Sequence, residues 1–130
     1  INNYIPYRDI PNELKKMDIL LMPYVSSITV AGNVGDITKF TSPLKLFDYL
    51  SVGKIIMCSD FNVLREAIKE KKNAIFIKNY ANPYSWKNEI QKLKNQPCKQ
   101  FIISKNNHTL SKKYSLISRA NTILEDIRFN

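Results

Sequence analysis

The chain is basic with an ordinary apolar content: 44% of its 130 residues are hydrophobic, and its formal net charge is +9 at pH 7. This composition predicts one domain with a buried core and excludes a disordered chain. No apolar run approaches the roughly 18 residues of a membrane-spanning helix, and no signal peptide pattern opens the sequence. One histidine and two distant cysteines, Cys58 and Cys98, offer no metal-ligand spacing, and these cysteines indicate reduced thiols in the cytoplasm.

Apolar runs and periodic segments alternate along the chain. They predict strands at 3–7, 19–23, 55–58 and 74–77, and helices at 11–17, 43–52, 63–71, 83–95 and 110–127, with Cys98 in a polar linker. Residues 25–41 predict a long loop, which in a compact domain is typical of a functional segment. Alternating strands and helices predict an α/β fold with right-handed crossovers and a parallel sheet, whose ligands bind beyond the carboxyl ends of the strands.

The predicted helix at 43–52 has a well-marked start and end. Ser42 can cap its first turn, Pro43 suits the first helical position, and Gly53 suits the left-handed residue that ends a helix. The unpaired N–H groups of the first turn and the charge of Lys45 favour a diphosphate there. Asp48, one turn further on, can accept hydrogen bonds from two sugar hydroxyls. The spacing predicts a nucleotide held at two points.

Each of these residues also has a structural explanation that involves no ligand. Ser42 and Pro43 can serve only as a helix cap, and Lys45 and Asp48 can be solvated surface charges. We expect an inward stripe of the helix that leaves Asp48 at its edge: Leu44, Phe47, Leu50 and Ser51. Glu66 is expected to support the loop at 59–60. The tripeptide Asn107-His108-Thr109 spells a glycosylation sequon, which we interpret as coincidence.

The segment 42–56, SPLKLFDYLSVGKII, resembles the donor site of glycosyltransferases with the GT-B architecture, within the large family 4 group of mostly retaining enzymes. Further pieces resemble the same family in the same order: 5–11, 17–24, 59–68, 73–77 and 113–124. The resemblance therefore covers nearly the whole chain. It departs from the family at Phe40, because many members carry there the first of two acids of which Asp48 matches the second.

The resemblance implies a Rossmann-like C-terminal nucleotide-sugar-binding domain over residues 1–130. The first part of this domain and the N-terminal acceptor domain are expected to lie outside the sequence, so that this piece alone would be inactive. It further implies a hexosyltransferase that retains configuration and uses no metal or cofactor. Ser42, Pro43, Leu44 and Lys45 would bind the donor diphosphate, Asp48 would bind the ribose, and Tyr7 and Arg8 would contact the nucleobase.

The implied partners are a nucleotide-sugar donor and a saccharide or lipid-linked acceptor in cell-envelope polysaccharide synthesis. The basic charge has three explanations: a compositional bias, attraction to an anionic membrane at the inner face of the cell membrane, or nucleic-acid binding. Nucleic acid is not expected, since no aromatic residues are interleaved with the basic ones on a strand. Two alternatives stay open: a non-catalytic doubly wound regulatory or interaction module, and a basic nucleic-acid-binding domain.

Overall fold

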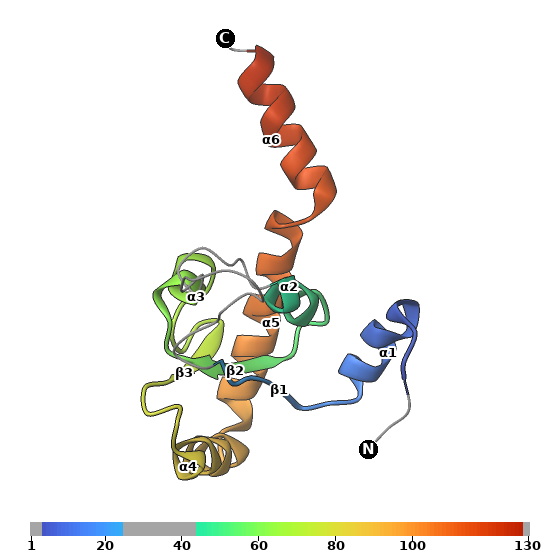
Figure 1. Ribbon diagram of the computed structural model, residues 1–130. Coiled ribbons are helices and arrows are strands. Elements are labelled where there is room, and N and C mark those ends of the chain that lie inside the picture. The colour runs from blue at the N-terminus through green and yellow to red at the C-terminus, as the bar shows by residue number, and fades with distance from the viewer. Residues whose placement is uncertain (1–3, 25–43, 129–130) are drawn as a thin grey trace, which may run out of the picture.

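The computed structural model describes residues 4–24 and 44–128. Its centre is a three-stranded sheet in the order β1-β2-β3, formed by β1 (Ile19–Met22), β2 (Ile55–Ser59) and β3 (Ala74–Ile77). Both pairings are parallel, with Ile19 opposite Ile55 and Ile56 opposite Ala74 (Figure 1). The predicted α/β fold with a parallel sheet is confirmed, and the arrangement is compatible with a Rossmann-like domain.

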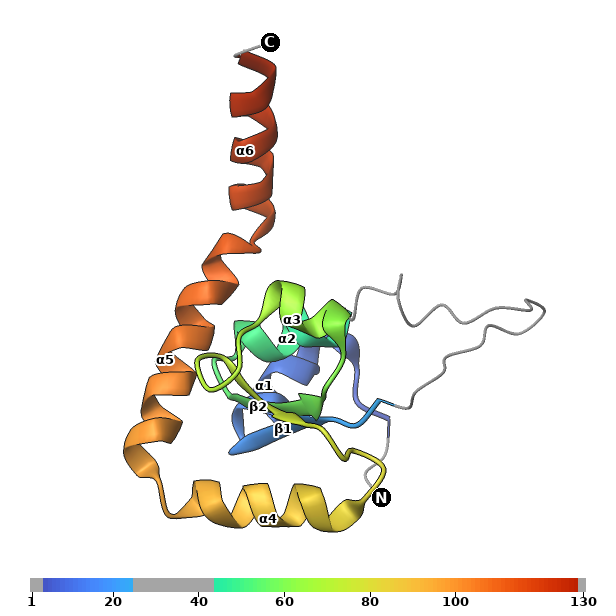
Figure 2. The same cartoon turned by 90° about the vertical axis from the view of Figure 1, so that its left-hand side faces the viewer.

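Helices cover both faces of this sheet. The 3-10 turn η1 (Tyr7–Asp9) and α1 (Ile10–Lys15) precede β1, and five helices follow it: α2 (Leu44–Ser51), α3 (Asn62–Ala67), α4 (Pro83–Lys94), α5 (Pro97–Lys113) and α6 (Leu116–Arg128). Figure 2 shows α2 and α3 on one side of the sheet and α4 on the other, with α5 reaching from one side to the other. Both crossovers, through α2 and α3, thus use the same face, as right-handed connections require.

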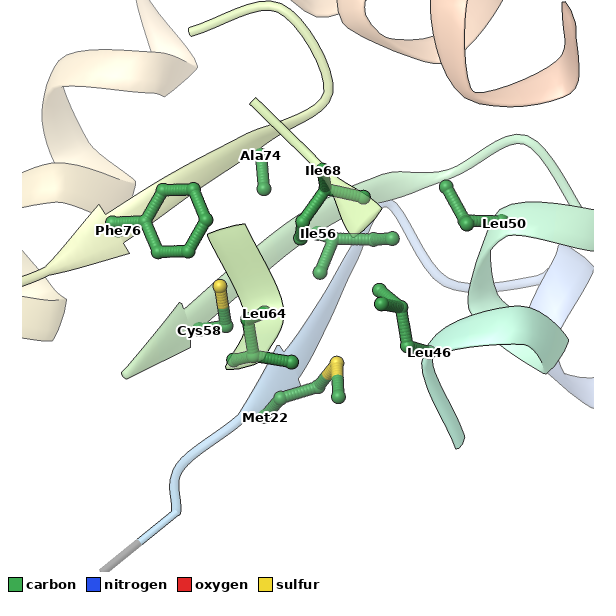
Figure 3. Close-up of a cluster of buried hydrophobic side chains, with 9 residues drawn as sticks. All are labelled: Met22, Leu46, Leu50, Ile56, Cys58, Leu64, Ile68, Ala74 and Phe76. Carbon is green, nitrogen blue, oxygen red and sulfur yellow. The ribbon is translucent and has the colours of Figure 1, made fainter. Parts of the chain in front are cut away.

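Two layers of apolar side chains hold the helices to the sheet. Under α2 and α3, Leu46, Leu50 and Leu64 pack on strand residues such as Met22 and Ile56 (Figure 3). On the opposite face the core consists of Ile55, Met57, Ile75, Ile77, Trp86, Leu93 and Ile103. All five residues of β2 are buried, because β2 is the central strand and both its faces are covered.

The helix α5 closes the amino-terminal ends of β2 and β3. The buried amide of Asn107 donates to the carbonyl oxygens of Lys54 and Asn73, both at 2.8 Å, and Asn107 Oδ1 accepts from Asn73 Nδ2 at 3.2 Å. Gly53 ends α2 with φ +64°, the left-handed conformation that its sequence position predicted. A Cβ atom at position 53 would lie 3.3 Å from His108 Cβ, so α2 and α5 approach closely at this turn.

Four predictions about elements are wrong. Residues 4–6 form no strand; Pro6 instead begins the η1 turn, in which Asp9 N donates to the Pro6 carbonyl at 2.9 Å. The expected linker around Cys98 belongs to α5, and the expected single helix at 110–127 is interrupted after Lys113. The predicted helix 63–71 ends at Ala67, because Ile68 turns to extended backbone and inserts its side chain into the core.

The last helix, α6, extends away from the domain and follows α5 (Figures 1 and 2). Ile117, Ile123 and Leu124 are exposed on it. Within residues 4–24 and 44–128, none of the helices combines the length and apolar character needed to cross a membrane.

Candidate functional site

The start of α2 lies at the carboxyl edge of the sheet, because a chain that connects two parallel strands must return along the sheet before it enters the second. Ser42 and Pro43, the predicted cap and first residue, lie outside the described residues. Leu44 and Lys45 form the first described part of the helix, and both side chains are exposed. The ammonium group of Lys45 is therefore accessible to a ligand at this edge.

The inward stripe of α2 differs from the predicted one. Leu46 and Leu50 are fully buried, whereas Leu44 is 77% exposed and Ser51 is also exposed. Phe47 is half-buried, and its ring packs edge-on against that of Tyr114, with 5.1 Å between the two ring centroids. Positions four residues apart on one helix face thus hold α2 to the sheet, and the exposed Leu44 is free to contact a ligand or the preceding segment.

Asp48 and Ser51 of α2 face η1 and α1 across a small hollow. Its other lining residues are Tyr7, Ile10, Pro11 and Leu14. The Ser51 hydroxyl donates to the backbone carbonyl of Asp48 at 2.7 Å and not to its side-chain carboxylate. The structure thus brings together Tyr7 and Asp48, which are 41 residues apart in sequence; Arg8 does not line the hollow and instead lies 3.8 Å from the carboxylate of Asp9.

This Tyr7–Asp48 hollow has a volume of about 50 Å³. Such a space holds a few water molecules, whereas cavities that enclose small ligands measure roughly 300–1,000 Å³. A nucleoside would therefore lie across the mouth of the hollow. Tyr7 is 73% exposed there and offers its ring as a stacking surface.

Two tyrosines close the carboxyl edge near β1. Tyr49 Oη donates to the Leu21 carbonyl at 3.4 Å, and Ser59 Oγ donates to the Tyr24 carbonyl at 2.9 Å. Burial raises the pKa of both phenols, and in Tyr24 the neighbouring Tyr49 raises it further. Both phenols stay neutral at pH 7, and among the described residues only that of Tyr49 forms a hydrogen bond. Neither tyrosine was predicted as a site residue, because an aromatic residue beside an apolar run is usually part of a core.

Arg65 bonds two carboxylates, one that follows β2 and one that precedes β3. Arg65 Nε donates to Asp60 Oδ1 at 2.6 Å and Nη2 donates to Glu70 Oε2 at 3.2 Å, while its Cζ lies 4.2 Å from the ring centroid of Phe76. The hydrogen bond from Arg65 lowers the pKa of Asp60 and fixes it as a carboxylate. The prediction that Glu66 supports this loop is wrong, because Arg65 does so and Glu66 is exposed.

The two cysteines differ in accessibility. Cys58 is buried in β2, where burial raises its pKa to about 12 and keeps it a thiol, whereas Cys98 is exposed on α5. In the part of the chain that the structure describes, no three His, Cys, Asp or Glu side chains lie together as metal ligands would.

Comparisons with models of protein families, with curated proteins and with solved structures give no match. The site is therefore defined by its own residues. These are a lysine at the start of α2, a carboxylate one turn later, and an exposed tyrosine facing that carboxylate.

Proposed function

We propose that this chain is the donor-binding part of a glycosyltransferase and binds a nucleoside diphosphate sugar at the start of α2. The observation that carries the proposal is the Tyr7–Asp48 hollow, which places an aromatic ring opposite a carboxylate one helical turn from Lys45. A nucleotide needs these three contacts: a surface for the base, an acceptor for the ribose hydroxyls, and positive charge for the diphosphate.

In this proposal the diphosphate lies at the first turn of α2. Glycosyl transfer breaks the bond between the anomeric carbon and the diphosphate oxygen, and the electron pair leaves with the diphosphate. The anomeric carbon forms a new bond to an acceptor hydroxyl, whose proton passes to the departing diphosphate. Lys45 and the backbone N–H groups of the first turn, that of Leu44 included, stabilise the charge that develops on the leaving group.

Asp48 would orient the donor through the ribose. Its side chain is half-buried on α2, where Asp48 lines the Tyr7–Asp48 hollow. Tyr7 would stack on the base, and Arg8, whose side chain is 85% exposed, can reach the same ligand from the outer side of η1. The acceptor would be a saccharide or a lipid-linked sugar of a cell-envelope glycan, and the resemblance favours retention of configuration.

A regulatory module is the first alternative. Receiver-type modules usually need free carboxylates clustered at the strand ends, whereas Asp60, which follows β2, is bonded by Arg65. A nucleic-acid-binding domain is the second. Its affinity would fall steeply with salt for any sequence, whereas donor binding would select one nucleobase.

Titration of the chain with UDP, GDP and ADP, and with the corresponding nucleosides, tests the proposal. We expect one diphosphate to bind. Lys45→Ala should weaken that diphosphate about tenfold and leave the nucleoside unchanged, since one charge-assisted contact is worth roughly 1.5–3 kcal/mol when well formed and less when exposed. Asp48→Asn should weaken both ligands.

Lys87→Ala, which removes an exposed lysine of α4, is the matched control and should bind like the unchanged chain. Diphosphate binding that neither Lys45→Ala nor Asp48→Asn alters would contradict the site, and so would the absence of binding by every nucleotide.

An anionic membrane surface is the second partner that we propose. The exposed Ile117, Ile123 and Leu124 of α6 follow two exposed lysines at the end of α5, Lys112 and Lys113. Apolar helix residues next to basic ones bind anionic bilayers. The chain should sediment with anionic vesicles at low salt and be released by high salt; equal sedimentation with neutral vesicles would contradict this.

A further inference from the structure

A second hollow lies at the other edge of the sheet, along β3. Its volume is about 550 Å³, within the range of small-molecule sites. The strand residues Phe76 and Ile77 contribute to its lining, with the turn before β3 on one side and α4 on the other. We call it the β3-edge groove; its polar lining residues are Glu70, Lys71, Lys78, Asn79, Ser85, Asn88, Glu89 and Lys92.

The two carboxylates of this groove are already bonded within the protein. Glu70 accepts from Arg65 at 3.2 Å through Oε2 and from the Phe76 backbone N–H at 3.4 Å through Oε1. Glu89 accepts from Lys92 Nζ at 2.6 Å. Among the described residues, Lys71 and Lys78 make no ion pair within 4.0 Å, although the charge of Lys78 helps to lower the pKa of Asp60. The groove thus presents two ammonium groups that no carboxylate contacts directly.

Lys71 stands in a conformation that usually belongs to glycine or asparagine. Its φ is +59°, and its backbone N–H donates to the Ala74 carbonyl at 2.8 Å, which closes the turn onto the edge of β3. A glycine would make the same backbone hydrogen bond with less strain. The backbone of this turn would accept a glycine at position 71, yet the residue is a lysine, and this lysine lines the groove.

The rest of the polar lining supplies uncharged hydrogen-bonding groups. Asn79 follows β3, and Ser85 and Asn88 belong to the first half of α4. Within residues 4–24 and 44–128, no hydrogen bond is formed by the side chains of these three residues, so all can bond a ligand. Amide and hydroxyl groups of this kind are suited to the hydroxyls of a sugar.

We propose that the β3-edge groove binds an anionic sugar, with its phosphate or carboxylate group between Lys71 and Lys78 and its hydroxyls at Asn79, Ser85 and Asn88. This inference does not rest on the proposed nucleotide site, which lies toward the opposite edge of the sheet and shares no residue with the groove. If both hold, the chain has one site for a nucleotide and another for a charged saccharide.

The test is a titration of the isotope-labelled chain with glucose 6-phosphate and with glucuronate, followed by NMR. Both anions should shift the amide signals of residues 70–79 and 85–92, whereas neutral glucose should not. Inorganic phosphate separates the two parts of the proposal: we expect it to bind at least fivefold more weakly than glucose 6-phosphate. Equal affinity would show an adventitious ion only and would overturn the sugar site.

Lys71→Gly separates binding from folding. Because glycine suits φ +59°, this variant should melt at the same temperature as the unchanged chain or at a higher one, and yet lose at least fivefold in affinity for both anionic sugars. Lys71→Asn and Lys78→Gln should also lose affinity, and Lys94→Gln, on α4 but outside the groove, should not. Unchanged affinity in Lys71→Gly and Lys78→Gln would overturn the proposal.

Discussion

Asn107 shows how much a single polar side chain contributes to this fold. It is fully buried in α5 and bonds the backbone at the start of β2 and of β3, through the carbonyl oxygens of Lys54 and Asn73. In the folded chain the Asn107 amide nitrogen is buried and donates to two carbonyls, so it is not accessible to a glycan in the Asn107-His108-Thr109 sequon.

We expect Asn107→Ala to lower the free energy of unfolding by about 2–4 kcal/mol, since it leaves buried carbonyl groups without donors. Asn106→Ala is the control: its amide donates to the Lys72 carbonyl at 2.9 Å at an exposed position, so its loss should cost less than about 1 kcal/mol. Urea denaturation measures both. A cost for Asn107→Ala no larger than that for Asn106→Ala would contradict this role.

Individual residues of the candidate site could be predicted only in part. Motif spacing singled out Lys45 and Asp48, and the family resemblance singled out Tyr7; Tyr7 and Asp48 line one hollow. The predicted buried face of α2 contained Leu44, whereas the structure buries Leu46. The two leucines are equally apolar, so only tertiary packing decides which of them is buried. Arg65 was missed, since nothing in the sequence pairs it with Asp60 and Glu70.

Among the elements, the strands and their neighbours were the most predictable. The runs at 19–22, 55–59 and 74–77 are apolar and short, and Asn82, which caps α4 by accepting from Tyr84 N at 2.9 Å, marks its start. The helix α5 was not recognised, because only Ile103 and Asn107 of its 17 residues are buried. A helix that crosses the ends of strands buries few residues and so shows little apolar periodicity.

The junction of α2 and α5 gives a prediction at this scale. Gly53→Ala should lower the free energy of unfolding by about 1–3 kcal/mol, because alanine is strained at φ +64° and its Cβ would lie 3.3 Å from His108 Cβ. Ser51→Ala, two residues earlier on the exposed side of α2, should change it by less than about 0.5 kcal/mol. If thermal or urea denaturation gives both variants the same stability, the close approach is not a constraint.

The whole molecule is asymmetric about its sheet. The helix α5 and the Asn107 bonds close the amino ends of β2 and β3, while polar residues follow each strand at the carboxyl edge: Tyr24, Asp60 and Lys78. The parallel topology predicts that ligands bind at this carboxyl edge. The position of η1 and α1 beside α2 could not be predicted, because it depends on tertiary packing between segments far apart in sequence.

The central claim is that α2, η1 and α1 together form a nucleotide site. Its most direct test is an NMR map of the amide signals that shift when the best-binding nucleoside diphosphate is added to the labelled chain. We predict that the largest shifts fall in two segments, Tyr7–Leu14 and Leu44–Ser51, and that residues 70–79 stay unchanged. Shifts confined to residues 70–92, or shifts in α2 without any in η1 and α1, would contradict the claim.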